Sequence, residues 1–451
     1  MGGCGLAGRT VDDLLCLLRS GAVSSRALVE EVLDSIAADG SAYVHVAVAR
    51  ARADADASDR QRLMGAGLLP LSGVPISIKD LFDVAGEVTT AGSERLRSAE
   101  PAKADAVAVA KLRAAGAIIV GRTHMSEFAF SGLGANPHFP VCANPYDRGH
   151  VPGGSSSGAA VSVARGQAAI GLGTDTGGSV RIPASFCGLV GFKPTQARIS
   201  RDGVFPLSPS LDSVGPIGNS VACCALVDQV LAGMEVVSLT LSPLRGMRLA
   251  IPQDLVLENM EASVALCFEQ TASLLSEAGA EVETVRFPHF GQVPQLFSRG
   301  AIVNAEAFAL HARLGLLNER DRYDPNVMAR IEMGERMSVS DINHLFAERR
   351  TMIAATNALS AGFDALILPT TPIVAPRFSD IADSMGFGRL NALALRNTSL
   401  FNFLDRCAVS IPMPTGSGLP AGLMIVGEHM RDSQLLSVAH VIETVLRGSS
   451  Q

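Results

Sequence analysis

Two segments rich in glycine and serine contain the residues of this sequence best suited to chemistry. Segment 153–158 reads GGSSSG and segment 173–179 reads GTDTGGS, so Ser155 and Ser179 lie 24 positions apart. The glycines before Ser179 allow successive backbone N–H groups to converge on one point without obstruction by Cβ atoms. Such donors stabilise the tetrahedral intermediate of acyl transfer, so we expect an oxyanion hole of main chain. Its donors would be Thr176, Gly177, Gly178 and Ser179.

Three other interpretations of these segments are disfavoured. A nucleophile elbow around Ser156 needs a strand directly before it, and residues 148–152 have the composition of a loop. A phosphate loop needs Lys and Ser or Thr after its last glycine, where this chain has Ala159 and Ala160. An aspartic protease needs a second Asp-Thr-Gly or Asp-Ser-Gly to share a proton with the first, and none is present.

A serine hydroxyl needs a base to become a nucleophile, and none of the nine histidines falls in either segment. Ser-Lys arrangements use a lysine in this role, so a lysine is the alternative base. In segment 74–79, aliphatic residues alternate with Pro75, Ser77 and Lys79, which predicts a strand that ends at Lys79 and Asp80. This strand would place one lysine at its carboxyl end.

The rest of the chain alternates between helical and strand patterns. Helical runs begin at Thr10 and Ser25, and charged helical patterns with few strand signals fill residues 290–359. Further helices are expected over 107–115, 156–165 and 264–275, and strands over 117–120, 168–173, 282–285 and 365–368. No Ser/Gly-rich or Pro-rich linker divides the chain, so we expect one continuous α/β domain with a partly parallel sheet.

The composition is that of a folded protein with a large core. Hydrophobic residues make up 47% and charged residues 18% of the 451 positions. The net charge is −7 and no basic run is present, which argues against direct nucleic-acid binding. No apolar stretch is long enough to span a membrane, and residues 1–9 lack a targeting pattern, so we expect a cytoplasmic protein. The eight cysteines lack metal-site spacing and are expected to be reduced and mostly buried.

Several separated motifs, taken together, resemble one known family. They are GVPISIKD at 73–80, PGGSSSGAA at 152–160, GTDTGGSVRIPA at 173–184, GFKPT at 191–195 and GLPAGL at 418–423. In this order and over most of the chain, they resemble the amidase signature family of Ser-Ser-Lys amidohydrolases. The resemblance implies a single amidase domain over 1–451, with a mixed, twisted β-sheet covered on both faces by helices. It also implies a variable helical region, about 290–360, near the substrate pocket.

The resemblance assigns a role to each residue of a catalytic triad. Ser179 would be the acyl-forming nucleophile, Ser155 the bridging serine held in a cis peptide, and Lys79 the terminal base. Lys79 must be neutral to accept a proton, and its ordinary pKa is ~10.4, so burial has to lower that pKa. The aliphatic strand around Lys79 makes such burial plausible.

Other positions follow from the same resemblance. Asp175 and Arg181 would form a structural pair that fixes the glycine turn, and Ala129 would line the acyl pocket. No metal and no cofactor are implied. Three positions differ from the residues common in the family and are expected to border a pocket or loop. They are His124, Ser157 and Met424.

The function expected on this basis is hydrolysis of a small carboxamide, with release of ammonia or an amine. The rival is the glutaminase (A) subunit of a tRNA-dependent amidotransferase, which shares the catalytic core but passes ammonia to partner subunits. A homodimer is compatible with either function, and the partners expected otherwise are limited to the amide substrate, with no nucleic acid and no membrane. The sequence does not name the amide.

Overall fold

A computed structural model describes residues 6–65, 69–240, 243–416 and 418–448. Its centre is a single mixed sheet. The strands are β1 (Tyr43–Val46), β2 (Pro75–Lys79), β3 (Ile118–Thr123), β4 (Ile170–Asp175), β5 (Val190–Lys193), β6 (Ser213–Gly218), β7 (Arg248–Pro252), β8 (Glu281–Val285), β9 (Ala365–Pro369), β10 (Ala408–Pro412) and β11 (Gly422–Val426). Within the described ranges the strand order is β1-β3-β2-β4-β6-β5-β10-β11-β9-β7-β8.

The sheet combines two parallel regions with an antiparallel centre. β2 pairs in parallel with both β3 and β4, and β7 pairs in parallel with β8 and β9. The strands between them, from β4 through β6, β5, β10 and β11 to β9, pair antiparallel. Every residue of β2 and β4 is buried, as expected for strands covered on both faces. The prediction of a partly parallel, mixed sheet is therefore confirmed.

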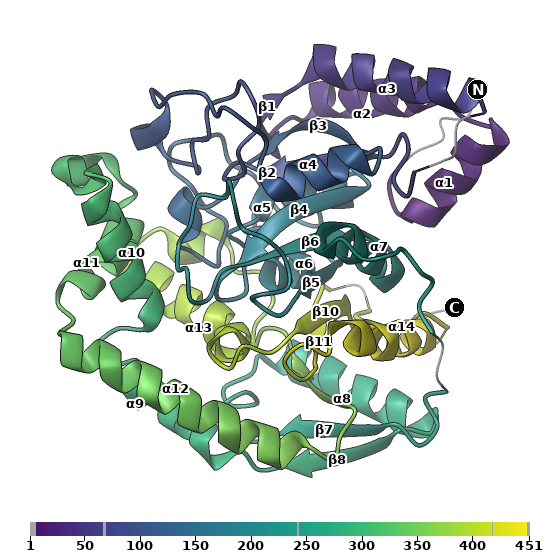
Figure 1. Cartoon of the computed structure of the whole chain (residues 1–451). Helices are drawn as coiled ribbons and strands as arrows, with labels where there is room; N and C mark the ends of the chain where they lie inside the picture. Colours follow the sequence, from purple (N-terminus) through teal and green to yellow (C-terminus); the bar gives the residue numbers. More distant parts are fainter. Residues whose placement is uncertain (1–5, 66–68, 241–242, 417, 449–451) are drawn as a thin grey trace.

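Helices cover the sheet on both faces. They are α1 (Val11–Ser20), α2 (Ser25–Ala38), α3 (Val48–Leu63), α4 (Val107–Ala114), α5 (Ser157–Ala164), α6 (Arg181–Phe186), α7 (Val221–Ala232), α8 (Ala262–Glu277), α9 (Val293–Leu296), α10 (Ile302–Arg313), α11 (Pro325–Glu335), α12 (Val339–Ser360), α13 (Ser384–Phe403) and α14 (Asp432–Gly448). One layer joins α4, α7, α14 and α8, and another joins α5, α6 and α13. In Figure 1, α1 to α3 lie at the β1 end of the sheet, and β7 and β8 lie at the other end.

The local signals in the sequence explain most element boundaries. Thr10 and Asp13 form the reciprocal capping box that starts α1, and the Ser24 hydroxyl caps α2. The expected strand at 117–120 continues to Thr123, because β3 is paired with β2 up to that residue. The expected strand at 168–173 is shifted to Ile170–Asp175, because β6 pairs with β4 as far as Asp175. Pairing with neighbouring strands, and not the local residue pattern alone, therefore determines where β3 and β4 end.

The helical region expected near 290–360 folds as α9 to α12, at the side of the sheet seen at the left of Figure 1. No helix in the described ranges is long and apolar enough to cross a membrane. The described cysteines are free thiols, and five are buried, whereas Cys16 is exposed and Cys267 intermediate. Cys4 and the first residues of the segment 1–9 lie outside the described residues.

Candidate active site

Lys79 is the last residue of β2, and its amine ends among hydroxyl groups. Its side chain is 0% exposed. The Nζ atom donates to Ser155 Oγ at 2.7 Å and to Thr174 Oγ1 at 3.0 Å. The parallel pairing of β2 with β4 places Thr174 beside the end of β2. Thr174 was missed from the sequence, although its place in the second glycine-rich segment was a signal that could have found it.

The surroundings of Lys79 favour its neutral form. Burial lowers the pKa of Lys79 to about 7, and the carboxylates of Asp175 and Asp212 oppose this only in part. Asp212 is another residue that the sequence did not single out, and it accepts a hydrogen bond from the Thr176 hydroxyl at 2.6 Å. Burial raises the pKa of Asp212 to about 6. Near neutral pH, the site therefore holds an amine that can accept a proton.

Ser155 reaches Lys79 from a loop that enters α5. The Gly154–Ser155 peptide bond is cis, which confirms the geometry implied by the family resemblance. The loop is attached to the second glycine-rich segment by a bond from the Ser156 N–H to the Ser179 carbonyl, at 3.2 Å. Within the described ranges, no hydrogen bond joins the Ser155 and Ser179 hydroxyls. A backbone hydrogen bond thus joins the loop of Ser155 to the turn of Ser179, without a hydrogen bond between the two hydroxyls in the described residues.

The turn between β4 and α6 is fixed by a fully buried ion pair. Arg181 Nη2 lies 2.9 Å from Asp175 Oδ1, and both side chains are 0% exposed. The same carboxylate accepts hydrogen bonds from the Gly178 N–H at 2.8 Å, the Val180 N–H at 3.2 Å and the Asn402 amide at 2.8 Å. Burial alone would raise the pKa of Asp175, but Arg181 outweighs it and holds that pKa below its usual value. The pair therefore has the geometry of the expected structural support.

Gly178 differs from its expected role. Its N–H donates to Asp175, so this group belongs to the support of the turn and is not directed at the pocket. Its φ of 133° and the position of Thr398 explain the need for glycine, because a Cβ would lie 2.2 Å from Thr398 Oγ1. In the described ranges, the N–H groups of Gly177 and Ser179 have no acceptor. The set of free oxyanion donors is therefore smaller than the sequence indicated.

Ser179 opens into a cavity of about 460 Å³ with mainly apolar walls. Ala129, expected in the acyl pocket, lines this cavity together with Thr176 and Gly177. Most of the remaining wall comes from residues between positions 207 and 403. Among its residues are Leu207, Leu211, Leu255, Val293, Phe297, Ile302, Arg330, Met333, Leu395, Arg396 and Phe403. Segment 290–360 thus contributes directly to the cavity.

Arg330, on α11, is a cavity residue that the sequence did not single out. Its guanidinium lies over the Phe130 ring at 4.5 Å. Its Nε atom is buried without a hydrogen-bond partner, and within the described ranges no carboxylate pairs with it. Burial lowers the pKa of Arg330 to about 10, so the side chain is still cationic at neutral pH. Only knowledge of the fold could have placed this cation near Ser179.

The three positions that differ from the family pattern have structural contacts. Two of these positions contact each other, since His124 Nδ1 lies 2.9 Å from Ser157 Oγ. Burial lowers the pKa of His124 to about 4, so its ring is neutral. Met424 was expected to border a pocket or loop, and this was wrong: it is buried in β11, where its Sδ lies 3.1 Å from Arg181 Nη1. The methionine at this position therefore contacts the Arg181 side chain that supports the turn between β4 and α6.

Within the described ranges, no group of His, Cys, Asp or Glu side chains has the arrangement of a metal site. The expectations of no metal and no cofactor stay predictions. What the observed groups can supply is a neutral amine, hydroxyls and main-chain donors beside an apolar cavity, which is the set needed for acyl transfer.

Comparisons with known proteins agree with this geometry. A sequence model of the amidase family matches residues 27–436. The chain is 35% identical to a 2-amino-5-chloromuconic acid deaminase of Comamonas testosteroni, over 85% of this chain and 83% of that protein. It is 32% identical to the A subunit of the glutamyl-tRNA(Gln) amidotransferase of Koribacter versatilis, over 97% of this chain and 98% of that one.

Solved structures give the same result. A crystal structure of an amidase superposes with a TM-score of 0.88 at 32% identity, covering 97% of this chain and 100% of that one. The fold, the motifs and the family match thus agree over nearly the whole chain. The chain belongs to the amidase signature family, hydrolases that act on carbon–nitrogen bonds other than peptide bonds.

Proposed function

We propose that this chain hydrolyses the C–N bond of a small carboxamide through an acyl-enzyme on Ser179, and releases ammonia or an amine. Lys79 supports this proposal most directly. Its amine lies 2.7 Å from Ser155 Oγ and has its pKa lowered to about 7 by burial. A lysine in this state is a base at neutral pH, and it lies within the distance needed for proton transfer.

The reaction begins with a proton relay. The lone pair of neutral Lys79 accepts the proton of Ser155, and Ser155 accepts the proton of Ser179 once a bound substrate brings the two hydroxyls together. Ser179 Oγ then forms a bond to the carbonyl carbon of the amide, and the carbonyl oxygen becomes an oxyanion. The N–H groups of Gly177 and Ser179 stabilise this charge, with Thr176 as the third expected donor.

The relay then runs in reverse. The tetrahedral intermediate collapses, the C–N bond breaks, and the proton held by Lys79 returns through Ser155 to the leaving nitrogen. A water molecule next gives a proton to the same relay and attacks the acyl ester, which releases the carboxylic acid and restores Ser179. The cycle requires no group outside the chain, its substrate and water.

The cavity favours an amide that also carries a carboxylate. Arg330 is a cation without a carboxylate partner in the described ranges, next to the cavity into which Ser179 opens. A guanidinium binds a carboxylate through paired, charge-assisted hydrogen bonds. The largely apolar remainder of the wall suits a hydrocarbon body between the acid and the amide.

The basic proposal is tested by ammonia release from a panel of aliphatic, aromatic and ureido amides. We expect turnover by the native protein and a loss of about 10⁴-fold or more in Ser179→Ala, because the nucleophile is removed. The variant should stay folded, with the same midpoint temperature of thermal unfolding as the native protein. Near-native rates in folded Ser179→Ala would refute the assignment.

The preference for acidic amides needs a matched pair of substrates. Succinamate and butyramide differ by a carboxylate in place of a methyl group. Arg330→Met should raise KM for succinamate by about tenfold or more and leave butyramide little changed, since a charged hydrogen-bonded pair is worth about 1.5–3 kcal/mol. Arg336→Met, at the exposed end of the same helix, is the control. Equal effects on both substrates would exclude a carboxylate-binding role.

The alternative function is that of the glutaminase subunit in a tRNA-dependent amidotransferase. It is favoured by the length of the match to such subunits, which covers 97% of this chain in the Koribacter versatilis relative. Glutamine hydrolysis by the isolated chain that rises on addition of the other subunits would support it. Efficient turnover of simple amides, without response to those subunits, would support the stand-alone amidase.

A further inference from the structure

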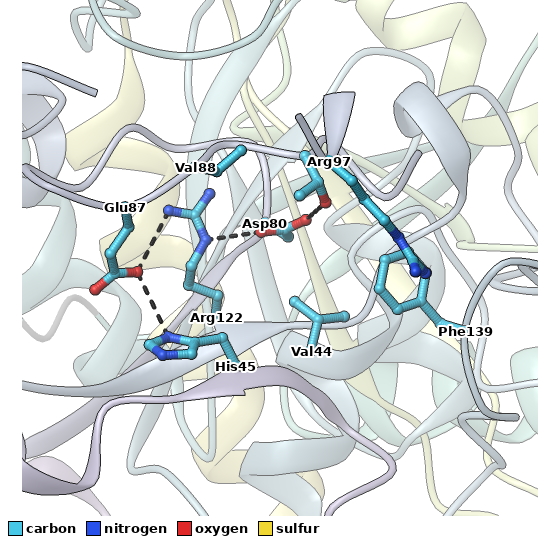
Figure 2. Close-up of a pocket in the computed structure, with 9 residues that line it drawn as sticks. Val44, His45, Asp80, Glu87, Val88, Arg97, Arg122 and Phe139 are labelled. Carbon is cyan, nitrogen blue, oxygen red and sulfur yellow. Dashed lines mark hydrogen bonds and ion pairs between the residues drawn. The ribbon is translucent and has the colours of Figure 1, made fainter. Parts of the chain in front are cut away.

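A second cavity lies beside Asp80, the residue that follows Lys79, and shares no lining residue with the cavity at Ser179. Its volume is about 510 Å³. Its lining residues are Val44, His45, Asp80, Glu87, Val88, Thr90, Arg97, Arg122 and Phe139. Figure 2 shows Arg122 between Asp80 and Glu87, with Arg97 and Phe139 side by side on another wall. None of these residues has a role in the proposed reaction.

Arg122, on β3, has hydrogen-bonding capacity that the protein leaves unused. It is 2% exposed, and its Nε donates to Asp80 Oδ1 at 2.7 Å. Its Nη1 and Nη2 atoms are buried and have no hydrogen-bond partner among the residues that the structure describes. Buried guanidinium groups normally satisfy their N–H donors, so two nitrogen atoms without a partner at a cavity wall need an explanation. Together, Nη1 and Nη2 form the planar fork that matches a carboxylate.

The other carboxylate of the cavity, that of Glu87, does not satisfy this fork. Glu87 Oε2 lies 3.6 Å from Arg122 Nη1 and 3.5 Å from His45 Nδ1, and both distances exceed that of a strong hydrogen bond. Glu87 belongs to a loop and is partly exposed, so its side chain can withdraw. A better-placed anion can therefore displace it.

The remaining walls define the size and type of the ligand. Arg97 adds a second cation, stacked over the Phe139 ring at 5.2 Å and half-exposed at the rim. Val44 and Val88 supply apolar surface. Because Asp80 and Glu87 already place two carboxylates here, a singly charged, planar anion suits the cavity better than a doubly charged phosphate.

We propose that this cavity binds a small monocarboxylic acid, with the carboxylate on the Nη1 and Nη2 atoms of Arg122 and its apolar body against Val44, Val88 and Phe139. Binding displaces Glu87 from Arg122, and Arg97 covers the bound anion. The test of this site does not depend on the proposed amidase function, because it measures binding of the acid and not turnover of an amide.

Calorimetric titration with benzoate tests the proposal, with benzamide and inorganic phosphate as comparison ligands. The protein titrated carries Ser179→Ala, which removes the proposed turnover of benzamide, and Arg330→Met, which removes the cation of the other cavity. We expect one site for benzoate, with at least tenfold weaker binding of benzamide, which lacks the charge, and of phosphate, which has the wrong shape and charge. Equal binding of benzoate and benzamide, or tighter binding of phosphate, would overturn the assignment.

Variants decide where benzoate binds. Glu87→Gln should strengthen binding several-fold, because it removes the competing carboxylate without touching Arg122. Arg97→Ala should weaken it about tenfold, and Arg122→Lys should abolish it while keeping the charge opposite Asp80. These changes are made in the protein that already carries Arg330→Met, so their effects on benzoate binding belong to the cavity at Arg122. If the Ser179→Ala protein binds benzoate only while Arg330 is intact, the acid binds beside Ser179 and the proposal fails.

Discussion

Lys79 and Asp80 are consecutive residues with the same burial and opposite surroundings. Their exposed fractions are 0% and 1%. Among the described residues, Lys79 Nζ contacts two hydroxyls and forms no ion pair with a carboxylate. Asp80 accepts hydrogen bonds from the Arg122 guanidinium at 2.7 Å, from the Thr90 hydroxyl and from the Gly92 N–H. One position thus has burial without a counter-ion, and the other has burial with one.

This difference separates a reactive group from a structural one. Without a counter-ion, burial destabilises the charged form, and the pKa of Lys79 falls to about 7. The cost to the free energy of unfolding is complete below about pH 7 and disappears above the ordinary pKa of 10.5, where the unfolded chain is neutral as well. At Asp80, the Arg122 guanidinium supplies the ion-pair partner that Lys79 lacks. The first arrangement favours proton transfer at the expense of stability.

Among the changes that test this comparison, the largest effect on activity is expected from Lys79→Met, which replaces the amine by an apolar group of similar length. We expect kcat/KM to fall about 10³- to 10⁴-fold, in the upper range for loss of a general base. The free energy of unfolding at neutral pH should rise, because a buried amine with a lowered pKa is removed. Activity assays and denaturant unfolding measure the two quantities.

Lys193 provides a matched control for this variant. It is also a buried lysine at the end of a strand, its pKa is also lowered by burial, and its Nζ donates to the Pro194 carbonyl instead of a serine. Lys193→Met should keep activity within about tenfold of the native value. Equal losses in both variants would mean that any buried lysine of the sheet is needed for folding, and would remove the case for Lys79 as base.

The reverse outcome is expected at Asp80. Asp80→Asn leaves the buried Arg122 guanidinium without its carboxylate, and breaking such a pair costs about 3–5 kcal/mol. Stability should fall by this amount, while kcat of the folded protein stays within tenfold of native. If the variant is as stable as the native protein but inactive, Asp80 belongs to the reaction and the contrast with Lys79 fails.

The sequence predicted the parts of this contrast that depend on local pattern. The alternation in 74–79 placed Lys79 at a strand end, and the glycines before Ser179 predicted a tight turn with main-chain donors. It did not reveal Thr174 and Arg330, which reach their places through strand pairing and helix packing across long stretches of chain. Gly178 shows a further limit, because only the fold directs its N–H at Asp175.

The pH dependence of the reaction follows from the lowered pKa of Lys79. As the pH falls below about 7, the amine becomes protonated and can no longer accept the Ser155 proton. We therefore expect kcat/KM to decrease about tenfold per pH unit below 7 and to be level above it. A profile still level at pH 5 would show that a different group is the base.

The smallest effect is expected at Thr174, which touches Lys79 without taking part in the relay. Thr174→Val removes one acceptor of the amine and keeps the size of the side chain, so the plateau of kcat/KM should fall about five- to tenfold through loss of positioning. The lost hydrogen bond stabilised the charged amine, and the acidic limb should therefore move to lower pH. Thr123→Val, at a buried threonine of the neighbouring strand, should change neither quantity. A lower plateau without a shifted limb would mean that Thr174 only packs against Lys79 and that burial alone sets its pKa.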